Sequence, residues 1–196
     1  MSSKLRPAVF LDRDGTVNEQ MGYINHISRF QLLPDAARAI KLLNNNGIPV
    51  VIVSNQSGLA RGYFPLALLD EVHEKMHRLL AQEGAHVDGL YYCPHHPEAK
   101  EEKYRQACNC RKPKTGMLLQ AAEEMDLDLS RSFVVGDRWS DVKCADRAGC
   151  TSVLVLTGYG RGDSDYIGPT QQIQPSYVAE NLFDAAEWIL QEIGTD

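Results

Sequence analysis

Long apolar runs are absent from this chain of 196 residues. None approaches the roughly 20 consecutive residues that a membrane-spanning helix needs. The N-terminus also lacks the apolar core of a signal peptide, because the charged residues Asp12 and Asp14 come too early. The 20 basic residues are outnumbered by 26 acidic ones, and the resulting net charge of −6 argues against binding nucleic acid through a broad basic face. We therefore expect a cytoplasmic protein with no membrane or nucleic-acid partner, and a monomer by default.

Cysteine is scarce as well, with five residues in the chain. In a reducing cytoplasm these thiols are expected to be metal ligands or core residues rather than a disulfide framework. Internal repeats and low-complexity tracts are not visible. The composition, 43% hydrophobic and 23% charged, is that of an ordinary globular protein. The length suits one domain with a sizeable core, which we place over residues 1–196.

Short apolar runs alternate with segments of helical period along the chain. The expected strands cover residues 8–12, 48–54, 89–93, 132–137 and 151–156. The expected helices cover residues 35–46, 65–84, 115–125, 139–148 and 182–193. Two stretches without a period, 94–114 and the Gly-rich 158–176, are expected to be loops, the second without a catalytic part. This order predicts the α/β class, with a single doubly wound parallel sheet.

Polar residues follow three of the expected strands, as DRDGT (12–16), SNQSG (54–58) and GDRWSD (136–141). In a doubly wound sheet, ligands bind at the carboxyl ends of the strands. Asp12 and Asp14 would repel each other there unless a cation lay between them. A site built from carboxylate oxygens and water suits Mg²⁺. The sequence therefore predicts a magnesium site at this edge of the sheet.

These motifs resemble those of the haloacid dehalogenase (HAD) superfamily of phosphohydrolases. Asp12-Arg13-Asp14-Gly15-Thr16 matches its D-x-D-G-T signature, and Ser54 resembles the second motif. Lys112 resembles the third motif, and Asp137 with Asp141 resembles the acidic fourth. The four motifs occur in the superfamily's order across residues 8–157, on the elements that the resemblance requires. The resemblance implies a phosphatase with a HAD-like, Rossmann-type fold.

The resemblance also implies a role for each motif residue. Asp12 would be the nucleophile that forms an aspartyl-phosphate, and Asp14 would protonate the leaving alkoxide and then deprotonate water, for which it needs a raised pKa. The side chains of Asp12 and Asp137 and the backbone carbonyl of Asp14 would hold Mg²⁺. Ser54 would bind a phosphoryl oxygen, and Lys112 would offset charge on the transferring group.

The sequence alone does not decide the role of Asp141. It could orient Lys112 or Arg138, or cap the helix that follows.

A second group of polar residues consists of three cysteines and a histidine in the arrangement C-x-H…C-x-C. Three thiolates and one imidazole satisfy tetrahedral Zn²⁺, and a closed set of four protein ligands is typical of a structural site. His96 could replace its neighbour as the nitrogen ligand, and reduced thiols without metal are the alternative. Two further cysteines, Cys144 and Cys150, are interpreted as core residues. The predicted zinc ligands are Cys93, His95, Cys108 and Cys110.

The spacing of the motifs leaves no room for a cap domain before Ser54. Only 37 residues, 17–53, separate the first motif from it, and a helix and a strand use much of that interval. We expect a capless phosphatase whose rim is formed by residues 18–33 and by the loop at about residues 93–110 that zinc would hold together.

Within the superfamily the sequence is similar to the D-glycero-D-manno-heptose-1,7-bisphosphate 7-phosphatases, which are close to the histidinol-phosphate phosphatases. The resemblance rests on FLDRDGTVN (10–18), Gly22-Tyr23, SNQSGLARG (54–62), YYCPHHP (91–97), CNCRKPKTGML (108–118) and VVGDRWSD (134–141). It implies a sugar bisphosphate as substrate, in ADP- or GDP-heptose biosynthesis. The implied substrate-binding residues are Gln20, Met21, Gly22, Tyr23, Asn55, Gln56, Ser57 and Arg111. The alternatives are histidinol-phosphate hydrolysis and, in another class, a non-catalytic zinc-stabilised binding module.

Overall fold

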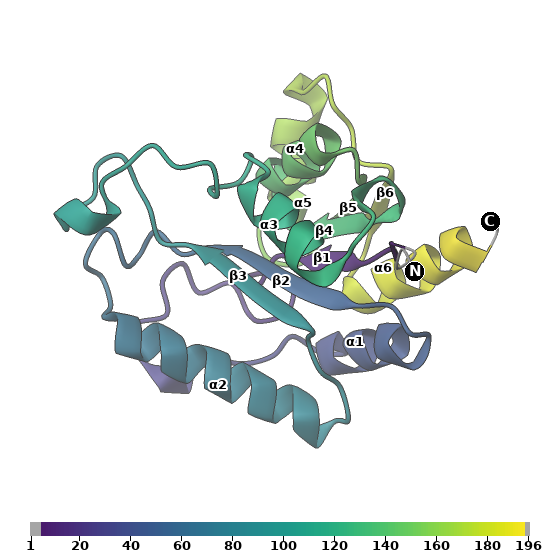
Figure 1. The fold of residues 1–196 in the computed structure, drawn as a ribbon, viewed down its shortest axis with the longest axis horizontal. Helices are drawn as coiled ribbons and strands as arrows, with labels where there is room; N and C mark the ends of the chain where they lie inside the picture. Colours follow the sequence, from purple (N-terminus) through teal and green to yellow (C-terminus); the bar gives the residue numbers. More distant parts are fainter. Residues whose placement is uncertain (1–4, 195–196) are drawn as a thin grey trace.

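A computed structural model describes residues 5–194 of the chain. Within them, six strands form one fully parallel sheet in the order β3-β2-β1-β4-β5-β6 (Figure 1). The strands are β1 (Val9–Leu11), β2 (Val50–Asn55), β3 (Gly89–Cys93), β4 (Phe133–Gly136), β5 (Thr151–Val155) and β6 (Tyr177–Ala179). The prediction of a single doubly wound parallel sheet is confirmed.

Helices cover both faces of the sheet. They are α1 (Ala36–Asn45), α2 (Leu66–Gln82), α3 (Gly116–Met125), α4 (Trp139–Ala148), α5 (Gly160–Gly162) and α6 (Leu182–Gly194). Figure 1 shows α1, α2 and α6 on one side of the strands and α3 and α4 on the other. Within residues 5–194, no helix is long and apolar enough to span a bilayer.

Two apolar layers fill the space between the sheet and its helices, because successive side chains of a strand point to opposite faces. Val9 and Leu11 of β1 pack with buried residues of α1, α2 and α6. Phe10 packs in the other layer, with buried residues of α3 and α4. A central strand that is buried on both faces accounts for the unbroken apolar runs in the sequence.

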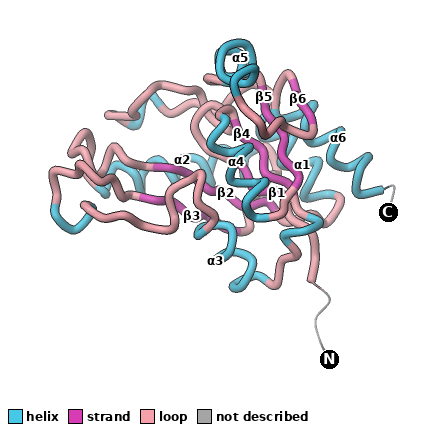
Figure 2. Tube along the Cα trace, turned by 90° about the horizontal axis from the view of Figure 1, so that it is seen from above, coloured by secondary structure: helices cyan, strands magenta, loops and turns pink. Residues whose placement is uncertain are grey.

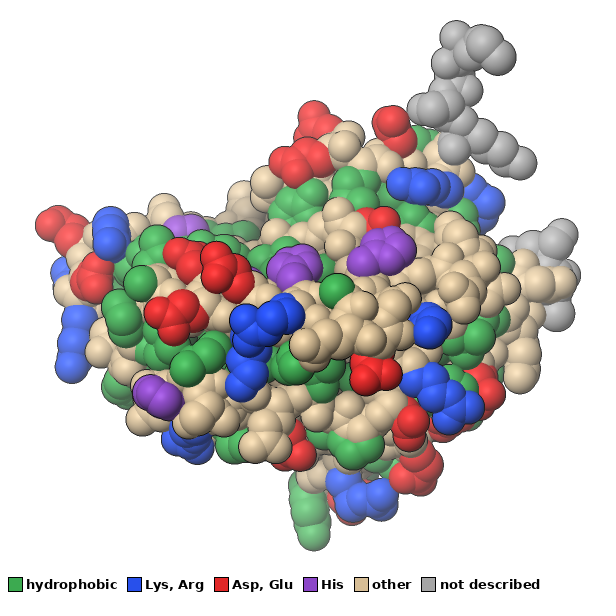
Figure 3. Space-filling view, turned by 90° about the horizontal axis from the view of Figure 1, so that it is seen from below, with side chains coloured by type: hydrophobic (Ala, Val, Ile, Leu, Met, Phe, Trp, Pro, Cys, Tyr) green, Lys and Arg blue, Asp and Glu red, His purple; other side chains and the backbone are tan. Residues whose placement is uncertain are grey.

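The outer face of α1 and α2 carries charges of both signs. On that face, seen from below, Lys and Arg side chains lie among Asp and Glu and form no continuous basic patch within the described residues (Figure 3). This mixture agrees with the acidic net charge of the chain.

The strand order creates one crevice at the carboxyl ends of the strands. The chain runs outward from β1 to β3 on one side and from β4 to β6 on the other, so the connections diverge between β1 and β4. Such a switch point is where doubly wound sheets bind ligands. Asp12 follows β1, Asp137 follows β4, and Ser54 lies near the end of β2. The loop after β3 extends beyond the strands on this side (Figure 2).

The five strands and five helices predicted from periodicity are all present. One strand was missed, β6, which is three residues long with Val178 exposed at the middle position, too short for a period to show. The prediction of a loop over 158–176 is wrong, because that segment contains α5, the π-turn Asp163–Ile167 and the 3₁₀ turn Gly168–Thr170. Its four glycines disfavour helix locally, so tertiary contacts hold these turns.

Candidate active site

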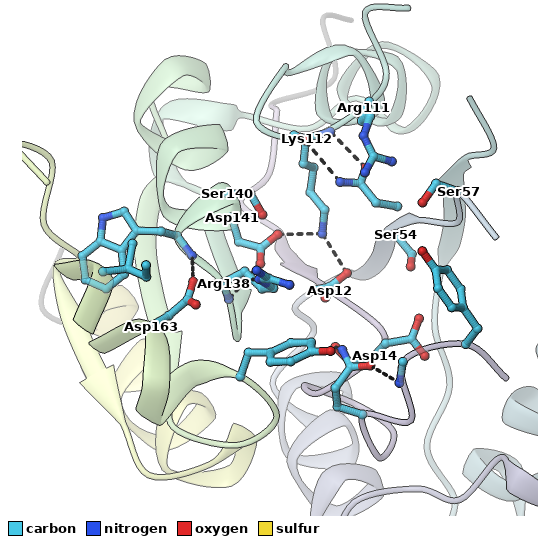
Figure 4. Close-up of a pocket in the computed structure, with 17 residues that line it drawn as sticks. Asp12, Asp14, Ser54, Ser57, Arg111, Lys112, Arg138, Ser140, Asp141 and Asp163 are labelled. Carbon is cyan, nitrogen blue, oxygen red and sulfur yellow. Dashed lines mark hydrogen bonds and ion pairs between the residues drawn. The ribbon is translucent and has the colours of Figure 1, made fainter. Parts of the chain in front are cut away.

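A cavity of about 550 Å³ opens at the switch point (Figure 4). Its walls come from the loops after β1, β2, β4 and β5 and from the segment before α3. The lining residues are Asp12, Asp14, Gln20, Gly22, Tyr23, Ser54, Asn55, Ser57, Arg111, Lys112, Arg138, Trp139, Ser140, Asp141, Tyr159, Asp163 and Ile167. All five residues predicted to carry the chemistry therefore lie in or beside one space, since Asp137 borders Asp12.

Lys112 joins the first and fourth motifs. Its Nζ lies 2.8 Å from Oδ1 of Asp12 and 2.7 Å from Oδ1 of Asp141, and it donates to the carbonyl oxygen of Val53 at 2.7 Å. Figure 4 shows the side chain pointing between the two carboxylates. Burial acts to lower the pKa of Lys112, but the two carboxylates outweigh it and raise the pKa, so the amine stays charged.

Neighbouring side chains fix both partners of this network. The amide of Asn55 exchanges two hydrogen bonds with the backbone of Lys112, at 3.0 and 3.2 Å. Asp141 lies at the third position of α4, where its second oxygen accepts from the Arg138 backbone N–H at 3.2 Å. The open question about Asp141 is settled by this geometry: it orients Lys112 and caps α4 at the same time.

Asp137 presents an oxygen with no partner. One carboxylate oxygen accepts from the Tyr159 N–H at 2.8 Å, but Oδ1 is buried and has no hydrogen bond within residues 5–194. A Cβ on either Gly15 or Gly158, both at positive φ, would collide with this carboxylate. The two glycines therefore keep a small space open beside Asp137.

The charges around that space favour a divalent cation. Asp12, Asp137 and Asp141 each offer a carboxylate oxygen within 4.8 Å of the others, and Lys112 supplies one positive charge against three negative ones. The balance of two uncompensated negative charges, with oxygen as the donor, fits Mg²⁺. Both oxygens of Asp141 are engaged, one by Lys112 and the other by the Arg138 N–H. Lys112 binds one oxygen of Asp12, and Oδ1 of Asp137 has no partner among the described residues, so Asp12 and Asp137 are the better candidates for ligands.

Burial and the crowding of carboxylates raise the pKa values of Asp12 and Asp137. Burial, only partly offset by Lys112, raises the pKa of Asp12 to about 6. Burial and the repulsion from Asp12 and Asp141 raise the pKa of Asp137 to about 8. Without a cation, the pair thus holds protons that ordinary aspartates release near pH 4.

The environment of Asp14 lowers its pKa, whereas its implied role calls for a raised one. Burial acts to raise its pKa, but the Arg13 guanidinium and hydrogen bonds from Asn18 and Gln56 outweigh burial and lower it. Arg13 Nη2 binds both carboxylate oxygens, at 2.9 and 3.0 Å. The expectation of a raised pKa is wrong for this state of the site, because an ion pair with the preceding residue holds Asp14 as a carboxylate.

Six of the eight predicted substrate-binding residues line the cavity: Gln20, Gly22, Tyr23, Asn55, Ser57 and Arg111. The structure does not place the other two on its wall. Met21 packs against the core, and the buried Gln56 bridges two site residues instead, donating to Ser54 Oγ and Asp14 Oδ2 at 2.8 Å each.

Several lining residues were not predicted from the sequence. Trp139 and Ser140 begin α4, and Tyr159, Asp163 and Ile167 belong to the segment that we expected to be a loop without a catalytic part. Asp163 accepts from the Trp139 N–H at 2.7 Å, which ties this segment to α4. None of these three segment residues stands at a strand end or in a motif, so no local signal identifies them.

Arg138, which the sequence named only as a possible partner of Asp141, lies on the cavity wall across from Arg111 (Figure 4). Its guanidinium lies 4.5 Å from the centre of the Tyr159 ring and is half-exposed. The cation is therefore available to an anion in the cavity while the ring restrains it.

The cysteine cluster ends at Cys110, directly before the cavity residue Arg111 in the sequence. Ligand atoms of Cys93, His95, Cys108 and Cys110 lie within 4.8 Å of one another. The Cys93 sulfur is 3.4 Å from that of Cys108 and 3.0 Å from that of Cys110, too far apart for disulfide bonds. Nδ1 of His95 lies 3.2 Å from the Cys110 sulfur. The set of donors and their closeness fit a tetrahedral zinc site.

The choice between the two histidines follows from the same geometry. His96 faces away from the sulfurs: its Nε2 contacts Arg61 at 2.9 Å, and its Nδ1 accepts the Glu98 N–H at 3.1 Å. His95 is therefore the nitrogen that completes the cluster.

The fold and the site together define a phosphatase of the HAD type, and the chain belongs to the HAD-like hydrolases. The HAD-hydrolase-like family model matches residues 109–185. D-glycero-D-manno-heptose-1,7-bisphosphate 7-phosphatase of Thermosynechococcus vestitus is 45% identical over 94% of this chain and 95% of its own length. D-glycero-beta-D-manno-heptose-1,7-bisphosphate 7-phosphatase of Escherichia coli K12 is 41% identical over 97% and 92%.

A solved structure agrees with these relatives. The D,D-heptose 1,7-bisphosphate phosphatase of B. bronchiseptica, complexed with magnesium and phosphate, superposes with a TM-score of 0.84. It is 39% identical and covers 95% of this chain and 99% of its own. Within the HAD-like hydrolases, the chain therefore belongs to the family of the heptose-bisphosphate phosphatases.

Proposed function

We propose that the chain removes the 7-phosphate from D-glycero-D-manno-heptose 1,7-bisphosphate, with Mg²⁺ as cofactor, in ADP- or GDP-heptose biosynthesis. The observation that carries the proposal is the grouping of Asp12, Lys112 and Asp137 at one end of a cavity that also holds two arginines. The names and coverage of the relatives support the choice of substrate.

The reaction follows from the placement of the carboxylates. An oxygen of Asp12 forms a bond to the 7-phosphorus as the bond from phosphorus to the sugar oxygen breaks, and Asp14, once protonated, gives its proton to that oxygen. Asp14 then takes a proton from the water that hydrolyses the aspartyl-phosphate. Ser54 donates a hydrogen bond to a phosphoryl oxygen, and the charge of Lys112 offsets the charge that builds on the transferring group. Mg²⁺, held by Asp12, Asp137 and the carbonyl of Asp14, would supply positive charge to the same oxygens.

Arg111 is our candidate for holding the second phosphate. It lines the cavity, and its Nη1 is buried without a hydrogen-bond partner within the described residues. A buried guanidinium donor without a partner is costly, and a phosphate that enters the cavity would satisfy it with a charge-assisted hydrogen bond.

A phosphate-release panel tests the proposed function. Both anomers of the heptose 1,7-bisphosphate and histidinol phosphate are incubated with the chain and Mg²⁺, and the products are assigned by ³¹P NMR. We expect release of one phosphate from the bisphosphate, with the C1 phosphate retained. A preference for histidinol phosphate would overturn the choice of substrate, and a folded protein without turnover on any of them would favour a non-catalytic module.

The pKa values of the metal pair predict a pH dependence of stability. Because the pKa values of Asp12 and Asp137 are raised from 3.8 to about 6 and about 8, the metal-free folded protein binds more protons than the unfolded chain in this window. Its stability from these two groups therefore falls as pH rises from about 4 to 8. Mg²⁺ favours both carboxylates, so its stabilising effect should be larger at pH 8.5 than at pH 6.

Thermal unfolding with and without Mg²⁺ at the two pH values measures this effect. Asp137→Asn is the informative variant: it should raise the melting temperature of the metal-free protein at pH 8.5 and reduce the shift caused by Mg²⁺. Equal magnesium shifts at pH 6 and pH 8.5 would contradict the assignment of the pair.

We further propose that zinc occupies the cysteine cluster and holds the loop that carries Arg111 and Lys112. Purified wild-type protein should contain about one zinc ion per chain. Cys110→Ser should remove the metal, lower the melting temperature and reduce turnover at least about tenfold, because Lys112 is two residues away. Metal analysis and phosphate release measure both effects. Cys150→Ser, at a buried cysteine outside the cluster, is the matched control and should keep its zinc. Wild-type protein that contains no zinc, and whose melting temperature is the same with and without added zinc, would refute the site.

Four expectations remain predictions: one domain over residues 1–196, a monomer, a cytoplasmic location, and the absence of nucleic-acid and membrane partners. The small-molecule substrate, a sugar phosphate, is the partner that the phosphatase assignment supports.

A further inference from the structure

Arg13 is a buried cation that the reaction as described does not use. Its side chain is 2% exposed and lies outside the cavity, under α2. The side chains around it are mostly apolar: Ile24, Phe64, Leu68, Leu69 and Val72, with Gln56 at one side. A guanidinium in such surroundings needs its donors satisfied and its charge balanced.

Two groups bind this guanidinium. Nη2 binds both oxygens of Asp14, and Nη1 lies 3.2 Å from Nε2 of His73. Nε has no hydrogen-bond partner within the described residues. Among the described residues, His73 is the one side-chain partner of this guanidinium other than Asp14, so the two residues fix its position through different nitrogens.

The chemistry of this contact determines the state of His73. Arginine can only donate, so Nε2 of His73 accepts and its ring proton resides on Nδ1. Burial and the nearby Arg13 charge lower the pKa of His73 to about 3, which keeps the ring neutral. His73 lies on the buried stripe of α2 between Val72 and Met76, so the helix holds it rigidly against the core.

We propose that His73 is a positioning residue for the phosphatase reaction: it fixes the guanidinium of Arg13, and Arg13 fixes the carboxylate of Asp14 at the edge of the cavity. The inference rests on the proposed function, because it assumes that Asp14 protonates the leaving group. Asn18 and Gln56 also bind Asp14, so loss of His73 displaces the carboxylate without releasing it. The effect is therefore smaller than loss of Asp14 itself.

The choice of leaving group separates positioning of Asp14 from general damage. A sugar alkoxide needs a proton in the step that forms the aspartyl-phosphate, whereas 4-nitrophenolate leaves without one. The value of kcat/KM reports on the reaction up to the first irreversible step, which here is attack by Asp12. A displaced Asp14 should therefore lower kcat/KM for the heptose bisphosphate and leave that for 4-nitrophenyl phosphate nearly unchanged.

Four variants carry the test, each assayed in the full chain with Mg²⁺. His73→Leu and His73→Asn remove the acceptor or withdraw it from reach, and each should lower the ratio of the two kcat/KM values about tenfold, mainly through kcat. His73→Gln has the same amide as Asn with one more methylene, so it can still accept from Arg13 and should restore the ratio to within about threefold. Met76→Ala, one turn along the same buried face, is the control: it should lower stability and leave the ratio unchanged.

Each outcome decides a separate question. If wild-type protein does not hydrolyse the heptose bisphosphate, the proposed function fails, and histidinol phosphate, also an alkyl phosphate, takes its place in the ratio. A ratio unchanged in both Leu and Asn variants overturns the role of His73, as does a ratio that Gln fails to restore. If the Leu variant does not fold, the comparison of Asn with Gln carries the test alone.

Discussion

Asp12→Asn should abolish phosphate release, lowering kcat at least about a thousandfold while the protein stays folded. The amide is nearly isosteric with the carboxylate but is too poor a nucleophile to attack phosphorus. It can still accept a hydrogen bond from Lys112, which also retains Asp141 and the Val53 carbonyl. The raised pKa of Asp12, about 6, means that the charged carboxylate is unfavourable in the metal-free fold above that pH. At pH 8 without metal, the variant should therefore melt no earlier than wild type.

Phosphate release and thermal unfolding, measured on the same preparation, test this expectation. Asp165→Asn changes an exposed aspartate outside the cavity and should leave both quantities unchanged. Turnover by Asp12→Asn within tenfold of wild type would exclude Asp12 as the nucleophile, whatever the stability of the variant.

The fold was largely predictable because the sheet is buried on both faces. Strands such as β2, with Val50 to Val53 all buried, leave no alternation in the sequence and are bounded by polar residues at their carboxyl ends. The same burial places Asp12, Ser54 and Asp137 at one edge, so the motif residues could be expected to converge. Edge strand β6 lacks this signal, since three residues with one exposed give no pattern.

The parts of the site that escaped prediction depend on contacts between distant segments. Tyr159 and Asp163 reach the cavity because the turns of residues 160–170 pack on the start of α4, where Gly168 lies against the Trp139 ring. The proton affinity of Asp14 depends on where the Arg13 side chain folds, and that follows from the position of α2. Spacing along the chain contains neither kind of information.

Asn55 and Asp141 show a third limit, in which residue type and place were right but the partner was unknown. Asn55 lines the cavity as expected, yet its amide is engaged with the Lys112 backbone. The sequence left three possible roles for Asp141: orienting Lys112, orienting Arg138 or capping the helix that follows. In the structure it pairs with Lys112 and caps α4. Both residues converge on Lys112, which makes that lysine the centre of the site.

Lys112→Met should therefore be the most damaging substitution to stability and activity together. It leaves Asp12 and Asp141 buried without their cation, and breaking a buried ion pair by removing one partner costs about 3–5 kcal/mol of unfolding free energy. It also removes the charge that offsets the transferring phosphoryl group, so kcat should fall about a hundredfold or more. Lys112→Arg should not restore turnover, because the broad planar guanidinium does not fit three acceptors placed for a compact ammonium.

Urea unfolding measures the loss of stability and phosphate release measures the loss of turnover. A second substitution, Asp141→Asn, separates the two losses. Lys112→Met combined with Asp141→Asn removes one of the uncompensated charges and should recover part of the stability without recovering kcat. Lys41→Met, at an exposed position of α1, is the control and should change neither. Recovery of turnover in the double variant would contradict a direct role for the lysine at the phosphoryl group. It would mean that Lys112 acts only by balancing the charge of Asp141, and the cation at the reacting oxygens would then have to come from the metal alone.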